Sequence, residues 1–324
     1  MRTAFLAAAV AAVAAISSSA GVAQQGYPSK PVKIVAPVQP GGGVDLVGRT
    51  VAEQLSKSMN ASFVVENLAG GGGVIASRTV ANASPDGYTL MVGYVATHGT
   101  NPAVRKLPYD AVKDFTPIAM VGGTPNVLAV PASVPAKNLQ ELLAYANQNA
   151  GKLSYGSAGQ GSLTHLAMEQ FRTAAGFDAV HAAYRGIGPA ITDLLGGQTQ
   201  MMMPGLAAAM PHIKGGKMRP IAVTGLKRHP LLPDVPTFEE SGFKGFDGIQ
   251  WYGIVGPAGM PPEITRQLNA EINKALGDPK LRERLSAEAL EPMPMTPEEF
   301  GKFMQDDIAR WSALAKERNI KLEE

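Results

Sequence analysis

Short apolar runs alternate with longer amphipathic segments along most of the chain. This strand–helix alternation is typical of parallel sheets with helices packed on their faces. The first cycle predicts strands at 32–37, 63–65 and 89–92, with helices at 45–59 and 74–82. Its β-α-β-α-β order predicts a layered α/β unit, because parallel neighbours need crossover connections.

A second cycle follows the first. It predicts strands at 127–130, 153–155, 179–183, 199–203 and 219–223, and helices at 139–149, 163–175, 190–195 and 210–214. Asn138 is expected to cap the first of these helices. A further strand at 249–255 precedes a helical tail, with helices at 263–276, 280–289 and 298–318.

The two cycles and the tail predict two α/β lobes. We expect the chain to return to the first lobe at Tyr252–Val255, so that it crosses between lobes twice, near Pro125-Asn126 and near Gln250-Trp251. The first lobe then contains 24–125 and 252–324, and the second contains 126–251. Two crossings make a hinge, and ligands favour the cleft beside one.

The first 23 residues read as a secretory signal peptide. Arg2 provides the positive start, Ala4 to Ile16 is apolar, and Gly21-Val22-Ala23 is a small-x-small cleavage pattern. The apolar run is too short to span a membrane, which takes roughly 20 residues. We therefore expect an exported protein without a membrane span.

Composition narrows the classes of function. The 29 Lys and Arg nearly balance 27 Asp and Glu, which argues against a nucleic-acid binder held by a basic patch. The absence of cysteine excludes disulfides, thiolate metal sites and cysteine nucleophiles. Glycine is frequent, with 36 in 324 residues, against an average of about 7%.

Two glycine runs mark a candidate ligand site. Gly41–Gly43 and Gly70–Gly73 each stand between a predicted strand and the helix after it. Ligands of open parallel sheets bind at this edge, and helix N-termini with converging N–H groups favour anions. Two tight turns without a ligand are the alternative. Asp45 fits an N-cap, and Glu66 is expected to hold its loop in place.

The second lobe repeats the arrangement twice. Ser157, Ser162 and Thr164 offer hydroxyls after a predicted strand, although Ser162 fits a helix N-cap equally well. The other loop contains Tyr184 and Arg185, and this arginine either pairs with a carboxylate or is a solvated surface residue.

Catalytic and metal signatures are weak. The sequence has no Walker loop, no Gly-x-Ser-x-Gly elbow and no His-Glu-x-x-His spacing. Among the histidines, His98 is the one to test, because it follows the third strand and is expected to point toward the cleft. We predict no metal and no cofactor.

Several ordered motifs resemble the Bug family, the periplasmic solute-binding proteins of tripartite tricarboxylate transporters. The resemblance covers nearly all of the chain after Tyr27. The motifs are Pro40-Gly41-Gly42-Gly43-Val44-Asp45 with Arg49, Glu66-Asn67 with Gly70-Gly71-Gly72, Pro85-Asp86-Gly87-Tyr88-Thr89-Leu90, Tyr184-Arg185-Gly186 with Pro189-Ala190, Leu232-Pro233-Asp234-Val235-Pro236-Thr237 and Trp251-Tyr252-Gly253.

The resemblance implies a type II periplasmic-binding-protein fold whose lobes close around a small carboxylate, with no enzymatic activity. It also implies a periplasmic monomer that delivers its ligand to membrane permease subunits. The loops and the resemblance together give a set of expected ligand contacts: Gln39, Gly41, Gly42, Gly43, Asp45, Gly71, Gly72, Thr97, His98, Ser157, Gly159, Ser162, Thr164, Tyr184, Arg185 and Met203.

Departures from the family pattern bear on the ligand. Leu68-Ala69 replaces Arg-Pro, and Met201-Met202-Met203 follows Thr199-Gln200 in place of Val-Asp. Fewer charges and more methionine suit an aromatic carboxylate or dicarboxylate, while ordinary core packing of the methionines is the alternative. Two other functions are considered. One is a carboxylate sensor that presents its closed form to a receptor, and the other is a secreted α/β hydrolase.

Overall fold

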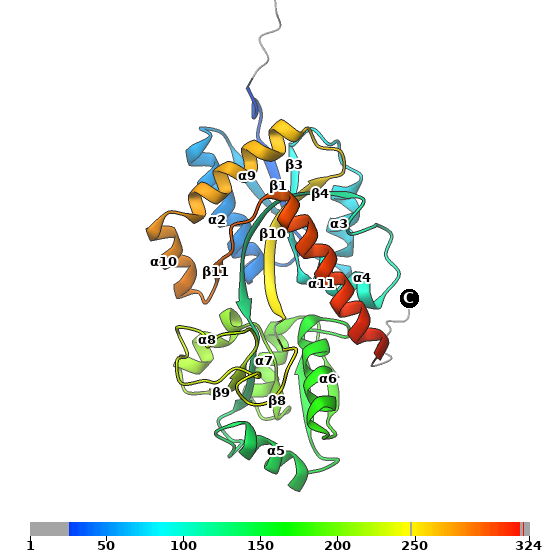
Figure 1. Cartoon of the computed structure of the whole chain (residues 1–324), viewed down its shortest axis with the longest axis vertical. Helices are drawn as coiled ribbons and strands as arrows, with labels where there is room; N and C mark the ends of the chain where they lie inside the picture. The colour runs from blue at the N-terminus through cyan, green and yellow to red at the C-terminus, as the bar shows by residue number, and fades with distance from the viewer. Residues whose placement is uncertain (1–25, 247, 318–319, 321–324) are drawn as a thin grey trace, which may run out of the picture.

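Two sheets build two lobes, shown one above the other in Figure 1. The computed structural model describes residues 26–246, 248–317 and 320. The predicted signal peptide lies outside the described residues. Among the helices that the structure describes, none is long and apolar enough to cross a membrane.

The first lobe is built on a six-stranded sheet with the order β11-β4-β10-β3-β1-β2. Strands β1, β2 and β3 are parallel, while β10 runs antiparallel between β3 and β4. The strands are β1 (Val32–Ala36), β2 (Phe63–Asn67), β3 (Thr89–Tyr94), β4 (Phe115–Pro125), β10 (Ile249–Pro257) and β11 (Glu291–Pro292).

Helices cover this sheet, and short helical segments lie in the loops at the carboxyl ends of its strands. Three of the helices begin on proline, whose fixed φ suits a first turn where no N–H partner is needed. The helical segments are α2 (Gly43–Ser58), η1 (Gly71–Gly73), α3 (Val74–Ala81), η2 (Ala96–Thr100), α4 (Asn101–Val104), α9 (Pro262–Leu276), α10 (Pro279–Ala287) and α11 (Pro297–Glu317).

The second lobe is built on a five-stranded sheet with the order β7-β6-β8-β5-β9. Asn138 caps its first helix as predicted, since its side chain accepts a hydrogen bond from the Glu141 N–H. The strands are β5 (Val127–Pro131), β6 (Ser154–Ser157), β7 (Val180–Ala183), β8 (Met201–Met202) and β9 (Met218–Val223); the helices are α5 (Leu139–Gln148), α6 (Leu163–Ala175), α7 (Ile187–Leu195) and α8 (Leu206–Lys214).

The lobes are linked by strands and by a shared apolar contact. Asn126 alone separates β4 from β5, and its side chain donates to the Met203 carbonyl at 2.8 Å. Helix α11 reaches down from the first lobe to α6, as Figure 1 shows. Leu163 and Leu166 of α6 share one apolar cluster with Trp311 of α11.

The sequence pattern missed β4, an 11-residue strand in the middle of the first sheet. Pro117, Gly122 and Gly123 interrupt its apolar pattern, so no alternation is visible. A Cβ added to Gly123 would lie 2.6 Å from Ile249 Cδ1. The glycines are therefore explained by close approach of neighbouring strands, which only the tertiary structure reveals.

Candidate ligand-binding site

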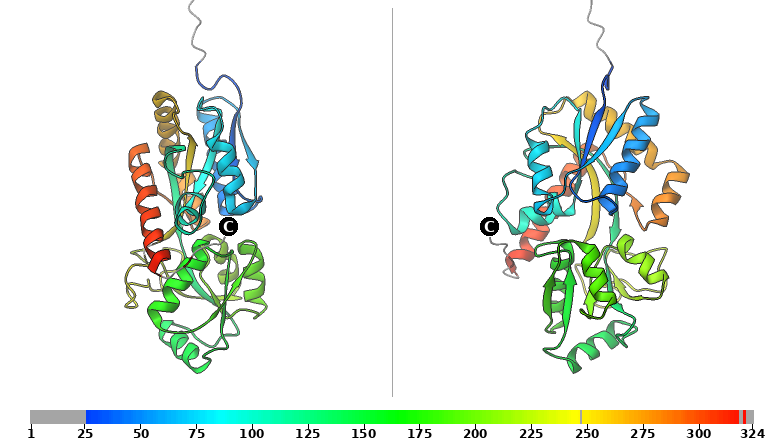
Figure 2. Two further views of the ribbon diagram at one scale, coloured as in Figure 1. Left: turned by 90° about the vertical axis from the view of Figure 1, so that its right-hand side faces the viewer. Right: turned by 180° about the vertical axis from the view of Figure 1, so that it is seen from behind.

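The carboxyl ends of the parallel strands in the two sheets face one another. Strand β5 leads away from the first lobe, and β8 runs antiparallel to it. Strands β6 and β7 are parallel to β8, so their carboxyl ends point toward the first lobe. Strand β3 ends beside the hinge end of β10, and β1 and β2 share its direction. The loops after these strands therefore approach each other from the two lobes, as Figure 2 shows.

The first glycine run leads directly into α2. Gly42 is the N-cap and makes no side-chain cap bond, so the N–H groups of the first turn have no partner from a capping side chain. Gly41 has a φ of +97°, which a side chain would strain. Gln39 lies exposed just before the run. The loop therefore presents backbone donors at the positive end of a helix dipole.

Asp45 holds this loop rather than capping the helix. It lies in the first turn of α2, so its predicted N-cap role is wrong. Its carboxylate accepts hydrogen bonds from Gly41 N (3.0 Å), Arg49 Nε (3.0 Å) and Asn67 Nδ2 (2.9 Å). Burial opposes ionisation, but the bonds from Arg49, Asn67 and Gly41 outweigh it and keep the Asp45 pKa below its ordinary value.

Asn67, not Glu66, ties the second loop to the first. Besides its bond to Asp45, Asn67 donates to the Val38 carbonyl at 3.2 Å. The Glu66 side chain is 52% exposed and lies 3.2 Å from Lys33 Nζ, which makes it a surface ion pair. The expectation that Glu66 holds its loop is therefore wrong.

The second glycine run needs glycine at all four positions. Gly70, Gly71, Gly72 and Gly73 have φ values of +140°, +58°, +66° and +91°. A Cβ on Gly73 would lie 2.5 Å from the Thr97 methyl carbon. The run folds into η1 and delivers the chain to the N-terminus of α3, so a second set of backbone N–H groups lies beside the first.

His98 is a core residue and does not point toward the cleft. Its ring is fully buried, 4.5 Å from the Phe115 ring, and its Nδ1 lies 2.8 Å from Thr97 Oγ1. Burial lowers the His98 pKa to about 3, so the ring is neutral. Thr97 is also buried, and its hydroxyl donates to the Tyr94 carbonyl at 3.2 Å.

The hydroxyls of the second lobe are used within their own loop. Ser162 is the N-cap of α6 and donates to the Gly159 carbonyl at 2.6 Å. Thr164 Oγ1 accepts from Ala158 N at 2.9 Å and lies 2.9 Å from Ser162 Oγ. These bonds, with those that Gly159 N and Gly161 N donate to Ser157 Oγ and His165 Nδ1, fix the loop after β6 and use most of its backbone donors.

Ser157 is paired with a histidine that the sequence analysis did not single out. Ser157 Oγ lies 2.6 Å from His181 Nε2. The pair resembles half of a hydrolase site, but no carboxylate in the described part of the chain hydrogen-bonds to His181, and Ser157 is fully buried. The serine also accepts from Gly159 N at 3.1 Å. We therefore assign the pair to loop structure.

The loop after β7 packs against the loop after β6. Tyr184 N donates to the Ser157 carbonyl at 3.1 Å, and the Tyr184 hydroxyl donates to Asp193 at 2.8 Å. Arg185 is exposed and forms no ion pair with any residue that the structure describes. Among the expected ligand contacts of the second lobe, Arg185 therefore has a positive charge that no described carboxylate neutralises.

The methionine run belongs to the core of the second lobe. Met201, Met202 and Met203 are fully buried and pack in its two apolar clusters. The expectation that methionine lines the cleft has no support in this arrangement, and ordinary core packing explains the run.

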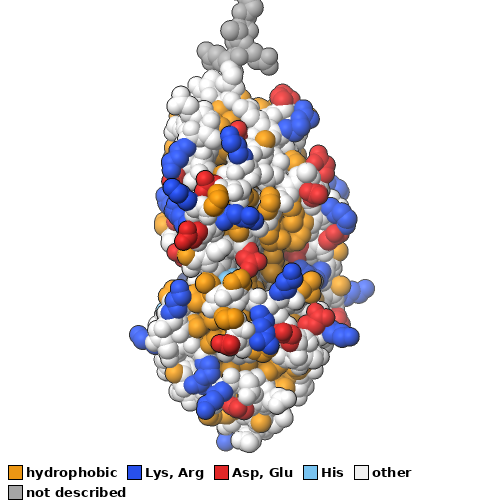
Figure 3. Space-filling model, turned by 60° about the vertical axis from the view of Figure 1, so that its left-hand side comes forward, with side chains coloured by type: hydrophobic (Ala, Val, Ile, Leu, Met, Phe, Trp, Pro, Cys, Tyr) orange, Lys and Arg blue, Asp and Glu red, His pale blue; other side chains and the backbone are white. Residues whose placement is uncertain are grey.

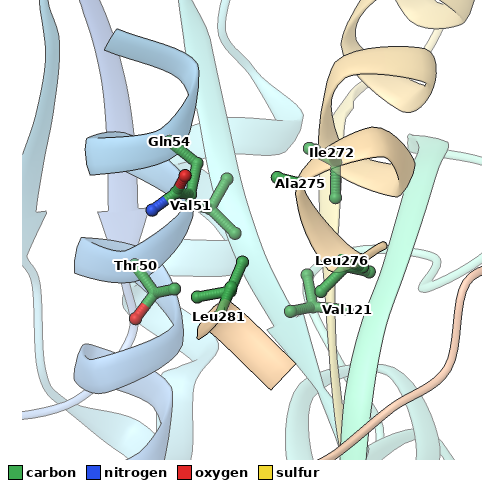
Figure 4. Close-up of a pocket in the computed structure, with 8 residues that line it drawn as sticks. All are labelled: Thr50, Val51, Gln54, Val121, Ile272, Ala275, Leu276 and Leu281. Carbon is green, nitrogen blue, oxygen red and sulfur yellow. The ribbon is translucent and has the colours of Figure 1, made fainter. Parts of the chain in front are cut away.

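One hollow lies away from the glycine loops, while another is lined by Arg105, whose guanidinium would be 3.8 Å from a Cβ on Gly72. The first has about 10 Å³ and is lined mainly by aliphatic side chains of α2, α9 and α10, among them Val51, Ile272 and Leu281 (Figure 4). It is about the size of one water molecule. A groove of about 450 Å³ runs past Arg105, Tyr109 and Ile308. In the described residues, no group of three or more His, Cys, Asp or Glu is arranged to hold a metal ion.

Sequence relatives agree with this architecture. Residues 47–320 match the tripartite tricarboxylate transporter family receptor. The chain is 32% identical over 313 residues to Protein BugT of Bordetella pertussis, covering 96% of each chain. It is 36% identical over 295 residues to a UPF0065 protein encoded between tcbD and tcbE in Pseudomonas sp., covering 91% of this chain and 88% of the relative.

Solved structures give the same assignment. An R. palustris protein with adipate has a TM-score of 0.86 at 34% identity, covering 91% of this chain and 99% of that one. MatC of Rhodopseudomonas palustris, with bound malate, has a TM-score of 0.81 at 33% identity, covering 89% and 99%. The chain belongs to the tripartite tricarboxylate transporter receptor (Bug) family of periplasmic solute-binding proteins.

Proposed function

We propose that this protein captures a small aliphatic dicarboxylate between its lobes and delivers it to the permease of a tripartite tricarboxylate transporter. The observation that carries this proposal is the pair of glycine runs at the N-termini of α2 and α3, joined through Asp45 and Asn67. Backbone N–H groups at helix N-termini bind an anion without a cation in the site. Arg49 offsets the charge of Asp45, so that carboxylate does not repel the ligand.

Capture requires the second lobe to contact the ligand as well. We propose that residues 24–125 with 252–324 move against residues 126–251, about the crossing at Asn126 and the return to β10. A ligand favours the closed state only by the extra contacts that it makes there. The exposed guanidinium of Arg185 is the second-lobe group suited to a distal carboxylate.

An aliphatic ligand fits the observations better than an aromatic one. The aromatic expectation depended on fewer charges and on methionines near the cleft, and Met201–Met203 are buried in the core. Two similar proteins have adipate and malate bound. These points support a dicarboxylate of about four to six carbons for this chain.

Calorimetric titration with a carboxylate panel tests the function. We expect saturable binding of adipate or malate, and weaker binding of terephthalate and of the dimethyl esters, which lack the charge. Binding of an aromatic diacid alone would overturn the aliphatic assignment. No binding of any carboxylate would overturn the function itself.

A further inference from the structure

Two tyrosines, the half-buried Tyr94 and the buried Tyr252, lie at the carboxyl edge of the first sheet, between the two glycine runs. Tyr94 ends β3 and is directly opposite Tyr252 of β10 in the antiparallel register. Opposed residues of an antiparallel pair point to the same face. Neither tyrosine was among the ligand contacts expected from the sequence.

Each ring touches one of the glycine runs. A Cβ on Gly43 would lie 2.5 Å from the Tyr252 hydroxyl oxygen, and one on Gly73 would lie 3.8 Å from Tyr94 Cε1. The Tyr252 hydroxyl is thus next to the N-terminus of α2, and the Tyr94 ring is next to the entry to α3. The two phenols line the inner wall of the region where the backbone donors converge.

Most of the other tyrosines use their hydroxyls in contacts within the protein. Five tyrosines hydrogen-bond through their hydroxyls to protein groups: Tyr27, Tyr88, Tyr109, Tyr155 and Tyr184. Within the described chain, the Tyr94 hydroxyl has no such acceptor, whereas the Tyr252 hydroxyl has the Gln250 side chain as a hydrogen-bond partner. Neither hydroxyl is among the fully buried polar atoms that lack a partner, so each is placed where a ligand at the glycine runs can accept from it.

We propose that the Tyr94 and Tyr252 hydroxyls donate hydrogen bonds to the carboxylate bound at the two glycine runs, and so determine which acids bind. This inference rests on the proposed function. Burial raises the pKa of both phenols, so both keep their protons and donate at any periplasmic pH. Both phenols are thus neutral donors, and the charges of the nearby Asp45–Arg49 pair offset each other.

The test uses Tyr94→Phe, Tyr252→Phe and the double variant, with Tyr145→Phe as control. Tyr145 lies on α5, and its ring is half-buried. Calorimetry with adipate and malate should show affinity about tenfold lower for each single variant and lower still for the double variant, because a hydrogen bond to a charged group is lost. The melting temperature without ligand should not fall for Tyr94→Phe, since no protein partner is lost, and should fall slightly for Tyr252→Phe, which loses the Gln250 contact.

A spectroscopic readout separates a direct contact from a change in packing. Ligand added to the wild type should give a tyrosine absorbance difference spectrum, and the double variant should not. If the wild type binds and the affinities of the single and double variants are all within twofold of the wild-type affinity, the inference is overturned and the proposed function stays intact. Absence of wild-type binding would overturn the proposed function, and this inference with it.

Discussion

The His165 and His181 rings stack 3.9 Å apart and almost parallel, directly beneath the loop after β6. His165 Nδ1 accepts from Gly161 N at 3.0 Å, and His181 Nε2 meets Ser157 Oγ. Two neutral rings stack in this way, whereas two imidazolium rings would repel each other. The geometry of a ligand loop therefore depends on both histidines being neutral.

This stack predicts acid-sensitive stability. Burial, together with the charge of His181, lowers the His165 pKa from 6.5 to about 4, although Glu169 partly opposes the shift and Arg172 adds to it. As the pH falls, His165 binds a proton near pH 6.5 in the unfolded chain but only near pH 4 in the folded protein. Its contribution to the free energy of unfolding is therefore fully present above pH 6.5 and is lost as the pH drops toward 4. Denaturant unfolding at pH 7.5 and 5.0 should show a loss of about 1–2 kcal/mol from this group.

The His165→Gln protein should lose less stability between these two pH values than the wild type. His212→Gln, on half-exposed α8, should behave like the wild type. Equal losses in wild type and His165→Gln would show that this histidine is not linked to folding.

Asp45→Asn should destabilise the protein and weaken ligand binding together. The carboxylate joins Gly41, Arg49 and Asn67, so the neutral variant leaves the first loop less constrained. Charge-assisted bonds of this kind contribute about 1–2 kcal/mol in a partly exposed setting. Denaturant unfolding and calorimetry measure the two effects.

Glu66→Gln is the control for Asp45→Asn, because Glu66 forms only an exposed pair with Lys33. It should change stability by less than about 0.5 kcal/mol. If Glu66→Gln weakened binding as much as Asp45→Asn, the assignment of loop control to Asp45 would be wrong.

The position of the two glycine loops was predictable, while the roles of the side chains around them were not. Gly41–Gly43 and Gly70–Gly73 lie where strands pass into helices, and that follows from residue order alone. Whether Ser162 faces a ligand or caps α6 depends on a rotamer, which spacing does not fix. The sequence could not place His181 beside Ser157 either, because their contact depends on the register between β6 and β7.

Long-range packing explains the remaining errors. His98 follows a strand that ends at the cleft, but the π-helical turn η2 carries its ring back to Phe115 in the core. On the face in Figure 3, positive and negative side chains are interspersed.

Gly73→Ala should destabilise the protein by about 2–4 kcal/mol, the sum of left-handed strain and a steric clash. Its φ is +91°, and the new methyl would lie 2.5 Å from Thr97 Cγ2. Gly151→Ala separates the two effects, since its φ is +76° but nothing lies within 4 Å of the new methyl. Thermal unfolding of Gly151→Ala should show a free energy of unfolding only about 1 kcal/mol lower than that of the wild type.

Thr97→Ser in the Gly73→Ala background should restore part of the stability, because serine keeps the hydroxyl and removes the clashing methyl. No recovery in the double variant would mean that Thr97 is not the group that excludes a side chain at Gly73.

Gly42→Val should abolish or strongly weaken ligand binding without unfolding the protein. Gly42 has an extended backbone (φ −97°, ψ 175°), and a Cβ there would meet nothing within 4 Å, so valine fits the fold. Its methyl groups would cover the N-terminus of α2, and we expect at least a tenfold loss of affinity by calorimetry. Gly26→Val is the matched control, because a Cβ at that position also meets open space, far from the glycine loops. A Gly42→Val protein with wild-type affinity and an unchanged melting temperature would exclude the N-terminus of α2 as the carboxylate site.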